Sequence, residues 1–218
     1  MRSIAIDGPA GAGKSTIARI LAKKMGYIYV DTGAMYRSMA LACLRKQVDK
    51  NDEQAVCEVC KQAEIAIRYE NGEQVVLLNQ ENVNGKIRTE EVGNVTSAIA
   101  VYPKVREKLV ELQRKLAHEE NVVMDGRDIG TTVLPDADTK IFLTAGTKVR
   151  AQRRYLELKE RNIACNLEEI EKDIEERDYR DSHREVSPLV QAKDAVLVDA
   201  SDLSIEEVVE KIMKIAQA

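Results

Sequence analysis

Short apolar runs alternate along the chain with stretches whose apolar residues recur at helical spacing. Residues 3–6 form a first apolar run, and from Ile17 apolar residues return every three or four positions until Gly26. A second run at residues 27–30 ends in the polar turn 31–37, which enters another helical stretch. Strand, loop and helix repeated at this length favour right-handed crossovers and a parallel sheet. The pattern therefore predicts an α/β fold.

Later apolar runs predict three more parallel strands, at residues 121–125, 139–143 and 196–198. Pro103 opens a helix with a predicted apolar stripe of Val105, Leu109, Leu112 and Leu116. Arg106 lies off this stripe, so we expect it to point toward a ligand. Ser204 and Glu207 predict a capping box at the start of the last helix.

The middle of the chain has a different pattern. From about residue 63 to residue 83 apolar residues alternate with others, and Asn71-Gly72 is a hairpin turn signal. An antiparallel hairpin inside a parallel α/β chain indicates a small inserted lobe, which we expect to close with a helix over residues 88–100.

The most specific chemical signal follows the first strand, where Gly-x-x-x-x-Gly-Lys-Ser joins strand to helix. In this context the motif is a phosphate-binding loop, whose backbone N–H groups and helix N-terminus bind a nucleotide triphosphate. Lys14 supplies a cation for the β- and γ-phosphates, and the Ser15 hydroxyl is a Mg²⁺ ligand. Kinases, GTPases and motor ATPases all share this loop. The expected nucleotide-binding residues are Gly8, Pro9, Ala10, Gly11, Ala12, Gly13, Lys14, Ser15 and Thr16.

Polar residues also follow the second predicted strand. Ligands bind at the carboxyl ends of parallel strands, so we expect Thr32, Tyr36 and Arg37 on the same rim as the loop. An ordinary helix surface explains Tyr36 and Arg37 equally well.

The strand at residues 121–125 ends in a group of charges beside glycines, which indicates a site in this architecture. Arg127 suits a phosphate, and Asp128 suits an amine or hydroxyl donor. A salt-bridged turn is the alternative interpretation.

Two arginine-rich helices are predicted at residues 149–161 and 168–184. The apolar stripe of the second continues in phase as Arg177, Asp181 and Arg184, which indicates that the helix enters a wet cleft. A solvated helix with internal ion pairs is the alternative. The connection at residues 161–166 is short enough to act as a closing lid.

Composition narrows the class of protein. The 218 residues fit one α/β domain with insertions, and the net charge of −4 argues against a dedicated nucleic-acid binder. The first run is a predicted strand and no run is long enough to cross a membrane, so we expect a cytoplasmic protein without a signal peptide.

Cys57 and Cys60 form a C-x-x-C without a second pair nearby, and we interpret them as buried, reduced thiols.

Across essentially its full length the chain resembles the bacterial cytidylate kinases, a family of nucleoside monophosphate kinases. The motifs that carry this resemblance, in their order and spacing, are GPAGAGKST (8–16), DTGAMYR (31–37), YPKVRE (102–107), DGRDIGT (125–131) and ERDYRDSHR (176–184).

The resemblance implies transfer of the ATP γ-phosphoryl group to CMP, and to dCMP, with Mg²⁺. It implies a five-stranded parallel sheet flanked by helices, a monophosphate-binding lobe enlarged by the insert, and a short lid. By motif, Arg127 and Arg184 grip the acceptor phosphate. The other implied acceptor-binding residues are Arg106, Ser97 and Asp128 at the base, Tyr36, Arg177 and Asp181 at the sugar, and Thr32 and Arg37 along the same pocket.

Arg153 and Arg154 are the lid arginines expected to close on the transferred group, and Asp125 is an indirect Mg²⁺ partner. We expect a monomeric single domain. Its parts are a core (1–31, 108–150 and 183–218), a monophosphate-binding lobe (about 32–107, insert about 63–100) and a lid (about 151–166).

Three rival interpretations remain. A P-loop kinase of another nucleotide or small acceptor is disfavoured by the Arg106 and Asp128 pair, and a panel of acceptors distinguishes it. A GTPase-type switch reads guanine through Asn-Lys-x-Asp, which the sequence lacks. A nucleic-acid-linked ATPase is disfavoured by the acidic charge.

Overall fold

The structure is a computed structural model that describes residues 1–70 and 72–217. The chain divides into two compact units. The first unit consists of Ile28–Asn121 with Met1, and the second unit consists of Arg2–Tyr27 and Val122–Ala218. As predicted, the fold is α/β, with a five-stranded parallel sheet and a small antiparallel sheet of three strands.

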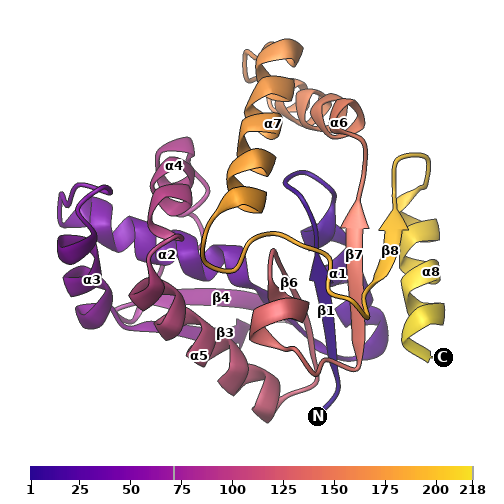
Figure 1. Cartoon of the computed structure of the whole chain (residues 1–218), viewed down its shortest axis with the longest axis horizontal. Coiled ribbons are helices and arrows are strands. Elements are labelled where there is room, and N and C mark those ends of the chain that lie inside the picture. Colours follow the sequence, from indigo (N-terminus) through magenta and orange to yellow (C-terminus); the bar gives the residue numbers. More distant parts are fainter. Residues whose placement is uncertain (71, 218) are drawn as a thin grey trace. The chain divides into compact units, whose positions relative to one another are not determined.

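Four strands of the parallel sheet lie in the second unit, in the order β6-β1-β7-β8 (Figure 1). They are β6 (Val122–Gly126), β1 (Ser3–Asp7), β7 (Thr139–Thr144) and β8 (Val196–Asp199). The register pairs Asp7 with Gly126, so β1 and β6 end side by side. Ile4, Ile6, Val123 and Ile141 in the interiors of β1, β6 and β7 are almost fully buried, whereas Leu197 in β8 is 52% exposed.

The helices of the second unit are α1 (Lys14–Met25), α6 (Thr147–Glu160), α7 (Leu167–His183) and α8 (Ile205–Gln217). Helix α1 ends at Gly26, whose φ of 67° suits a glycine C-cap. The predicted capping box of α8 is confirmed, because Ser204 Oγ and Glu207 Oε2 lie 2.8 Å apart and Glu207 N donates to Ser204 Oγ.

A short π-helix, η1 (Ile129–Val133), follows β6. Its wide turn is closed by Val133 N donating to Asp128 O and by Leu134 N donating to Ile129 O. The apolar and polar pattern does not predict this element.

The first unit contains β2 (Ile28–Asp31), α2 (Thr32–Arg45), α3 (Glu53–Gln62), α4 (Glu90–Ile99) and α5 (Pro103–Glu119). The predicted hairpin is present as β3 (Ile65–Glu70) and β4 (Glu73–Leu78), which pair antiparallel, and β5 (Glu81–Asn82) extends this sheet. Of the predicted turn, Asn71 lies outside the described residues, and Gly72 has a φ of 79°.

The predicted apolar stripe of α5 is confirmed in part, but the expectation that Arg106 lies off the buried face is wrong, since Arg106 is 4% exposed. Val105 and Leu109 are buried, but Leu112 and Leu116 are only half-buried. The buried face also includes Arg106, Val110 and Gln113. Arg106 tolerates burial because its Nη1 donates to Ala100 O and its guanidinium lies 5.6 Å from the Tyr36 ring centroid.

Cys57 and Cys60 are buried and unbridged, as predicted, and Cys43 is buried as well. Burial raises the pKa of the Cys43 thiol to about 11, and it also raises the pKa of Cys57 and Cys60.

In residues 1–70 and 72–217 no group of three or more histidine, cysteine or acidic side chains has a metal-binding arrangement. Within the same ranges, no helix has the length and apolar character needed to span a bilayer.

Candidate active site

The phosphate-binding loop connects the end of β1 to the start of α1 in the second unit. Gly8 has a φ of 149°, and a Cβ at this position would lie 1.9 Å from Leu143 O in β7. Only glycine fits where the loop passes so close to a backbone carbonyl. Gly13 is the N-cap of α1, with a φ of 89°, so the first N–H groups of the helix follow the loop directly. The loop thus has the geometry of an anion-binding helix N-terminus.

Lys14 begins α1 and is buried, with 6% of its surface exposed. Its Nζ donates to Pro9 O at 2.7 Å, which folds the side chain back over the loop. Burial lowers the pKa of Lys14 well below its usual range, and the nearby charge of Arg127 lowers it further. A bound polyphosphate would oppose both effects, because its negative charge favours the ammonium form.

Ser15 and Asp125 lie together beside the loop. Ser15 Oγ donates to Asp125 Oδ2 at 2.8 Å, and Asp125 is 5% exposed at the end of β6. A hydroxyl and a carboxylate are oxygen ligands of the kind that Mg²⁺ prefers, with phosphates and water completing its coordination. The donor set therefore fits a nucleotide-bound Mg²⁺.

Asp7, which the sequence interpretation did not assign, holds the loop that carries Arg127 and Asp128. Its Oδ1 accepts from Ile129 N at 2.8 Å and its Oδ2 accepts from Gly130 N at 2.7 Å. Burial raises the pKa of Asp7 to about 6, although both backbone hydrogen bonds act in the opposite direction. In the sequence, the available signal for this role of Asp7 was a charged residue at the end of an apolar strand.

Two arginines predicted to bind the acceptor phosphate are paired with predicted acceptor-binding carboxylates. Arg127 Nε donates to Asp181 Oδ2 at 2.8 Å, and Arg184 Nη2 lies 3.6 Å from Asp128 Oδ1. Burial acts to raise the pKa of Asp181, but the charges of Arg127, Arg177 and Arg184 outweigh it and lower the pKa. The structure thus gathers all five of these residues into one charged cluster.

The two predicted lid arginines have other partners. Arg153 Nη2 donates to Ala200 O at 2.6 Å, and Arg154 pairs with Glu157 one turn further along α6 at 2.8 Å. Their role in closing on a phosphoryl group remains a prediction.

Arg150 and Asp178, neither of them assigned from sequence, contact the phosphate-binding loop. Arg150 Nη1 donates to Ala10 O at 2.8 Å, and Asp178 Oδ1 accepts from Ala10 N at 3.2 Å. The position of Asp178 directly after Arg177 in a recognised motif was the only signal in the sequence.

In the first unit, Asp31 caps α2 by accepting from Ala34 N at 2.9 Å and also pairs with Arg88, which fixes the buried Thr32 next to it. Tyr36 lies against Arg106. Of the other two predicted acceptor-binding residues of this unit, Ser97 is on α4, and Arg37 is on α2 with its guanidinium against α4.

Gly93 in α4 makes room for the guanidinium of Arg37, since a Cβ there would lie 3.3 Å from Arg37 Nη1. Ser97, one turn further along α4, donates from Oγ to Gly93 O at 3.3 Å.

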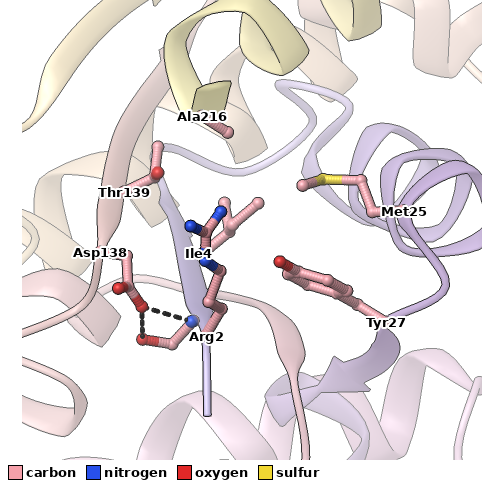
Figure 2. A pocket seen from close by; sticks show the side chains of 8 residues that line it. Arg2, Ile4, Met25, Tyr27, Asp138, Thr139 and Ala216 are labelled. Atoms are coloured by element: carbon pink, nitrogen blue, oxygen red, sulfur yellow. Dashed lines mark hydrogen bonds between the residues drawn. The ribbon is translucent and has the colours of Figure 1, made fainter. Parts of the chain in front are cut away.

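A separate small pocket lies at the amino ends of β1 and β7 (Figure 2). Arg2, Ile4, Met25, Tyr27 and Thr139 are among its lining residues, and its volume is about 20 Å³. This is space for a water molecule and not for a nucleotide. The end of the sheet that carries the phosphate-binding loop is therefore the candidate active site.

The glycine-rich loop with its lysine, between a strand of a parallel sheet and a helix N-terminus, defines a P-loop nucleotide-binding protein. Solved structures share the fold. An uncharacterized protein from Eubacterium ventriosum has a TM-score of 0.57 at 11% identity, covering 100% of this chain and 99% of that one. A shikimate kinase from Bacteroides thetaiotaomicron has a TM-score of 0.52 at 15% identity, with the same coverage. At these identities the likeness shows the fold alone.

Sequence similarity is more specific. The sequence profile of the cytidylate kinase family matches residues 4–218. A cytidylate kinase from Lactobacillus gasseri is 51% identical over 100% of this chain and 94% of its own length. Cytidylate kinases from Leuconostoc mesenteroides and Bacillus cereus are also 51% identical, over 98% of this chain and 96% and 95% of their own lengths. The chain belongs to the cytidylate kinase family.

Proposed function

We propose that the protein transfers the γ-phosphoryl group of ATP to CMP, and also to dCMP, giving the diphosphate and ADP. The observation that carries this proposal is membership of the cytidylate kinase family across residues 4–218, in a chain whose phosphate-binding loop has the required geometry. The reaction belongs to pyrimidine nucleotide metabolism and needs no covalent intermediate, because phosphoryl transfer depends mainly on positioning and charge neutralisation.

In this proposal the donor binds at the loop of residues 8–16. The backbone N–H groups and Lys14 hold the phosphates, and Ser15 would hold Mg²⁺, with Asp125 beside it as an indirect partner of the ion. When bound, the ion neutralises charge on the phosphates of ATP. The buried position of Lys14 supports this assignment, since a desolvated ammonium gains most from an anionic ligand.

We assign the acceptor phosphate to Arg127 and Arg184. Both guanidinium groups already lie beside carboxylates of the same cluster, and a phosphate competes for the same donors with more charge. Arg177 and Asp181 are assigned to the sugar. From the first unit, the proposal adds Tyr36 at the sugar, Arg106 and Ser97 at the base, and Thr32 and Arg37 along the acceptor pocket.

Asp128 is proposed to read the base together with Arg106. Cytosine presents an amine donor beside two acceptors, so a carboxylate accepts from the amine while a guanidinium donates to the acceptors. Uracil has an acceptor oxygen in place of the amine, which leaves the buried carboxylate without its donor. CMP is therefore expected to be a better substrate than UMP.

A panel of acceptors tests the proposed function. ADP release is measured from ATP and Mg²⁺ with CMP, dCMP, UMP, AMP, GMP or shikimate, and rapid turnover is expected with CMP and dCMP and slower turnover with UMP. The alternative, a P-loop kinase of another acceptor, predicts that a different member of the panel is preferred. Absence of turnover with every acceptor would contradict both.

The role of Asp128 is tested by Asp128→Ala. The ratio of kcat/KM for CMP over UMP is expected to fall toward one. An unchanged ratio would rule out base reading by this residue.

The proposal also includes a cytoplasmic location, where ATP and CMP are available, and a monomeric state. The core, lobe and lid boundaries predicted from the sequence belong to the same proposal. Arg153 and Arg154 are proposed to leave their present partners when the lid closes.

A further inference from the structure

One residue of the phosphate-binding loop, Ala10, is hydrogen-bonded at both its backbone N–H and its C=O by the two members of a single ion pair. Ala10 O accepts from Arg150 Nη1 at 2.8 Å, and Ala10 N donates to Asp178 Oδ1 at 3.2 Å. Arg150 Nη1 and Asp178 Oδ2 are themselves 2.6 Å apart. The pair thus binds the backbone donor and acceptor of one loop residue, which fixes the two peptide groups on either side of the Ala10 Cα.

Arg150 is rigidly anchored at the start of α6. Its side chain is 5% exposed, its Nε donates to Ala145 O at 2.8 Å, and its Nη2 donates to Thr147 Oγ1 at 3.0 Å. The next loop residue packs on it as well, since a Cβ on Gly11 would lie 3.5 Å from Arg150 Cβ. A buried guanidinium with this many partners has one available orientation.

Asp178 lies on α7 among residues of the proposed acceptor site. Asp181, three positions later and on the same side of the helix, pairs with Arg127 at 2.8 Å. One stretch of α7 therefore binds the phosphate-binding loop through Asp178 and the loop after β6 through Asp181. Helices α6 and α7 are in contact in the second unit, at the top of the view in Figure 1.

We propose that Arg150 and Asp178 are positioning residues that couple binding of the phosphoryl donor to binding of the acceptor. This inference rests on the proposed function, because it identifies α7 as an acceptor-binding helix. The pair holds α7 and the phosphate-binding loop in one relative position. A phosphoryl donor that orders the loop therefore favours the arrangement of α7 that the acceptor needs, and the acceptor favours the arrangement that the donor needs.

The charges of Arg150 and Asp178 determine which of the two residues contributes more to ATP binding. The Asp178 carboxylate lies beside a loop that binds a polyanion, and Arg150 neutralises it. Removal of Arg150 leaves a partly buried carboxylate facing the phosphates, whereas removal of the Asp178 charge leaves a cation there. Loss of the arginine is therefore more harmful to ATP binding, and loss of both charges is less harmful than loss of the arginine alone.

The test compares Arg150→Met, Asp178→Asn and the double variant with the wild-type chain. Lys172→Met is the matched control, because Lys172 is on the same helix and its side chain is 76% exposed. Affinity for a non-hydrolysable ATP analogue is measured by calorimetry with and without CMP, and the ratio of the two values is the coupling. Thermal unfolding of each variant is followed by circular dichroism.

Arg150→Met is expected to weaken binding of the ATP analogue by roughly tenfold or more, and the double variant is expected to recover part of this loss. The coupling with CMP, roughly fivefold or more in the wild-type chain, is expected to approach one in all three variants and to stay unchanged in Lys172→Met. A purely structural role changes the melting temperature without removing the coupling.

Coupling that is unchanged in the variants, absent from a wild-type chain that binds CMP, or lost equally in the control would overturn the proposal. If Arg150→Met does not fold, the proposal is tested by measuring the same coupling with CMP in the near-isosteric variant Asp178→Asn. Failure of the proposed function is distinguishable, because it appears as a wild-type chain that binds the ATP analogue and does not bind CMP.

Discussion

Asp7 makes the folding stability of the protein depend on pH in an unusual direction. Its carboxylate is 5% exposed and accepts from two backbone N–H groups of η1, yet burial raises its pKa from 3.8 to about 6. Asp128 nearby raises the pKa further and Lys14 lowers it. The folded chain therefore holds the Asp7 proton more tightly than the unfolded chain does.

The stability that Asp7 contributes is fully present below pH 3.8 and is lost as the pH rises through about 6. The difference between these pKa values corresponds to roughly 3 kcal/mol at neutral pH. Asp7→Asn removes the titration. It also puts an amide N–H₂ against one of the two backbone donors, which costs roughly 1–3 kcal/mol at every pH.

The assay is urea unfolding of the wild-type chain and of Asp7→Asn at intervals from pH 4 to pH 7. Far-ultraviolet circular dichroism is the suitable signal because the chain contains no tryptophan. The wild-type free energy of unfolding is expected to fall relative to that of the variant by roughly 2–3 kcal/mol across this range. Taking the difference cancels the other carboxylates, several of which have lowered pKa values and act in the opposite direction.

Asp202→Asn is the control for the loss of one carboxylate, because Asp202 is exposed in the turn before α8. A difference between the wild-type chain and Asp7→Asn that is constant, or that increases with pH, would refute the assigned pKa and the burial that causes it.

Three further substitutions have outcomes set by single contacts. Gly8→Ala places a Cβ 1.9 Å from Leu143 O, so it is expected to lower the free energy of unfolding by roughly 3 kcal/mol and abolish ATP binding; a melting temperature equal to wild type would contradict the close approach. Ser15→Ala removes the hydroxyl bound to Asp125 and should raise the Mg²⁺ concentration for half-maximal rate by roughly tenfold or more, and an unchanged requirement would exclude Ser15 as a ligand. Lys108→Met removes the ammonium that donates to Cys60 O and Ala63 O at 2.7 and 2.6 Å. The loss should lower the free energy of unfolding by roughly 1–3 kcal/mol and leave KM for ATP unchanged. A raised KM would show that these two hydrogen bonds also affect the active site.

Local patterns were sufficient to predict much of the fold. The strand before Gly8, the helix that ends at Gly26 and the inserted hairpin each produce their signal within a short window of sequence. The phosphate-binding loop is predictable for the same reason, because its glycines and lysine all lie within residues 8–14.

Interactions between distant positions were not predictable in this way. The bond from Ile129 N to Asp7 joins residues 122 positions apart, and the bond from Ala10 N to Asp178 joins residues 168 positions apart. Each side chain looks in sequence like an ordinary charged residue. Arg106 shows the same limit, because helical periodicity treats an arginine as exposed unless its partner, here Tyr36, is known.

The central claim is tested most directly by following the γ-phosphoryl group itself. The protein is incubated with ATP labelled at the γ-phosphate, Mg²⁺ and CMP, and the labelled products are separated by chromatography. The account predicts that the label appears in CDP, with one ADP formed for each CDP. Label that appears as inorganic phosphate, or that stays in ATP while CMP is unchanged, would contradict it.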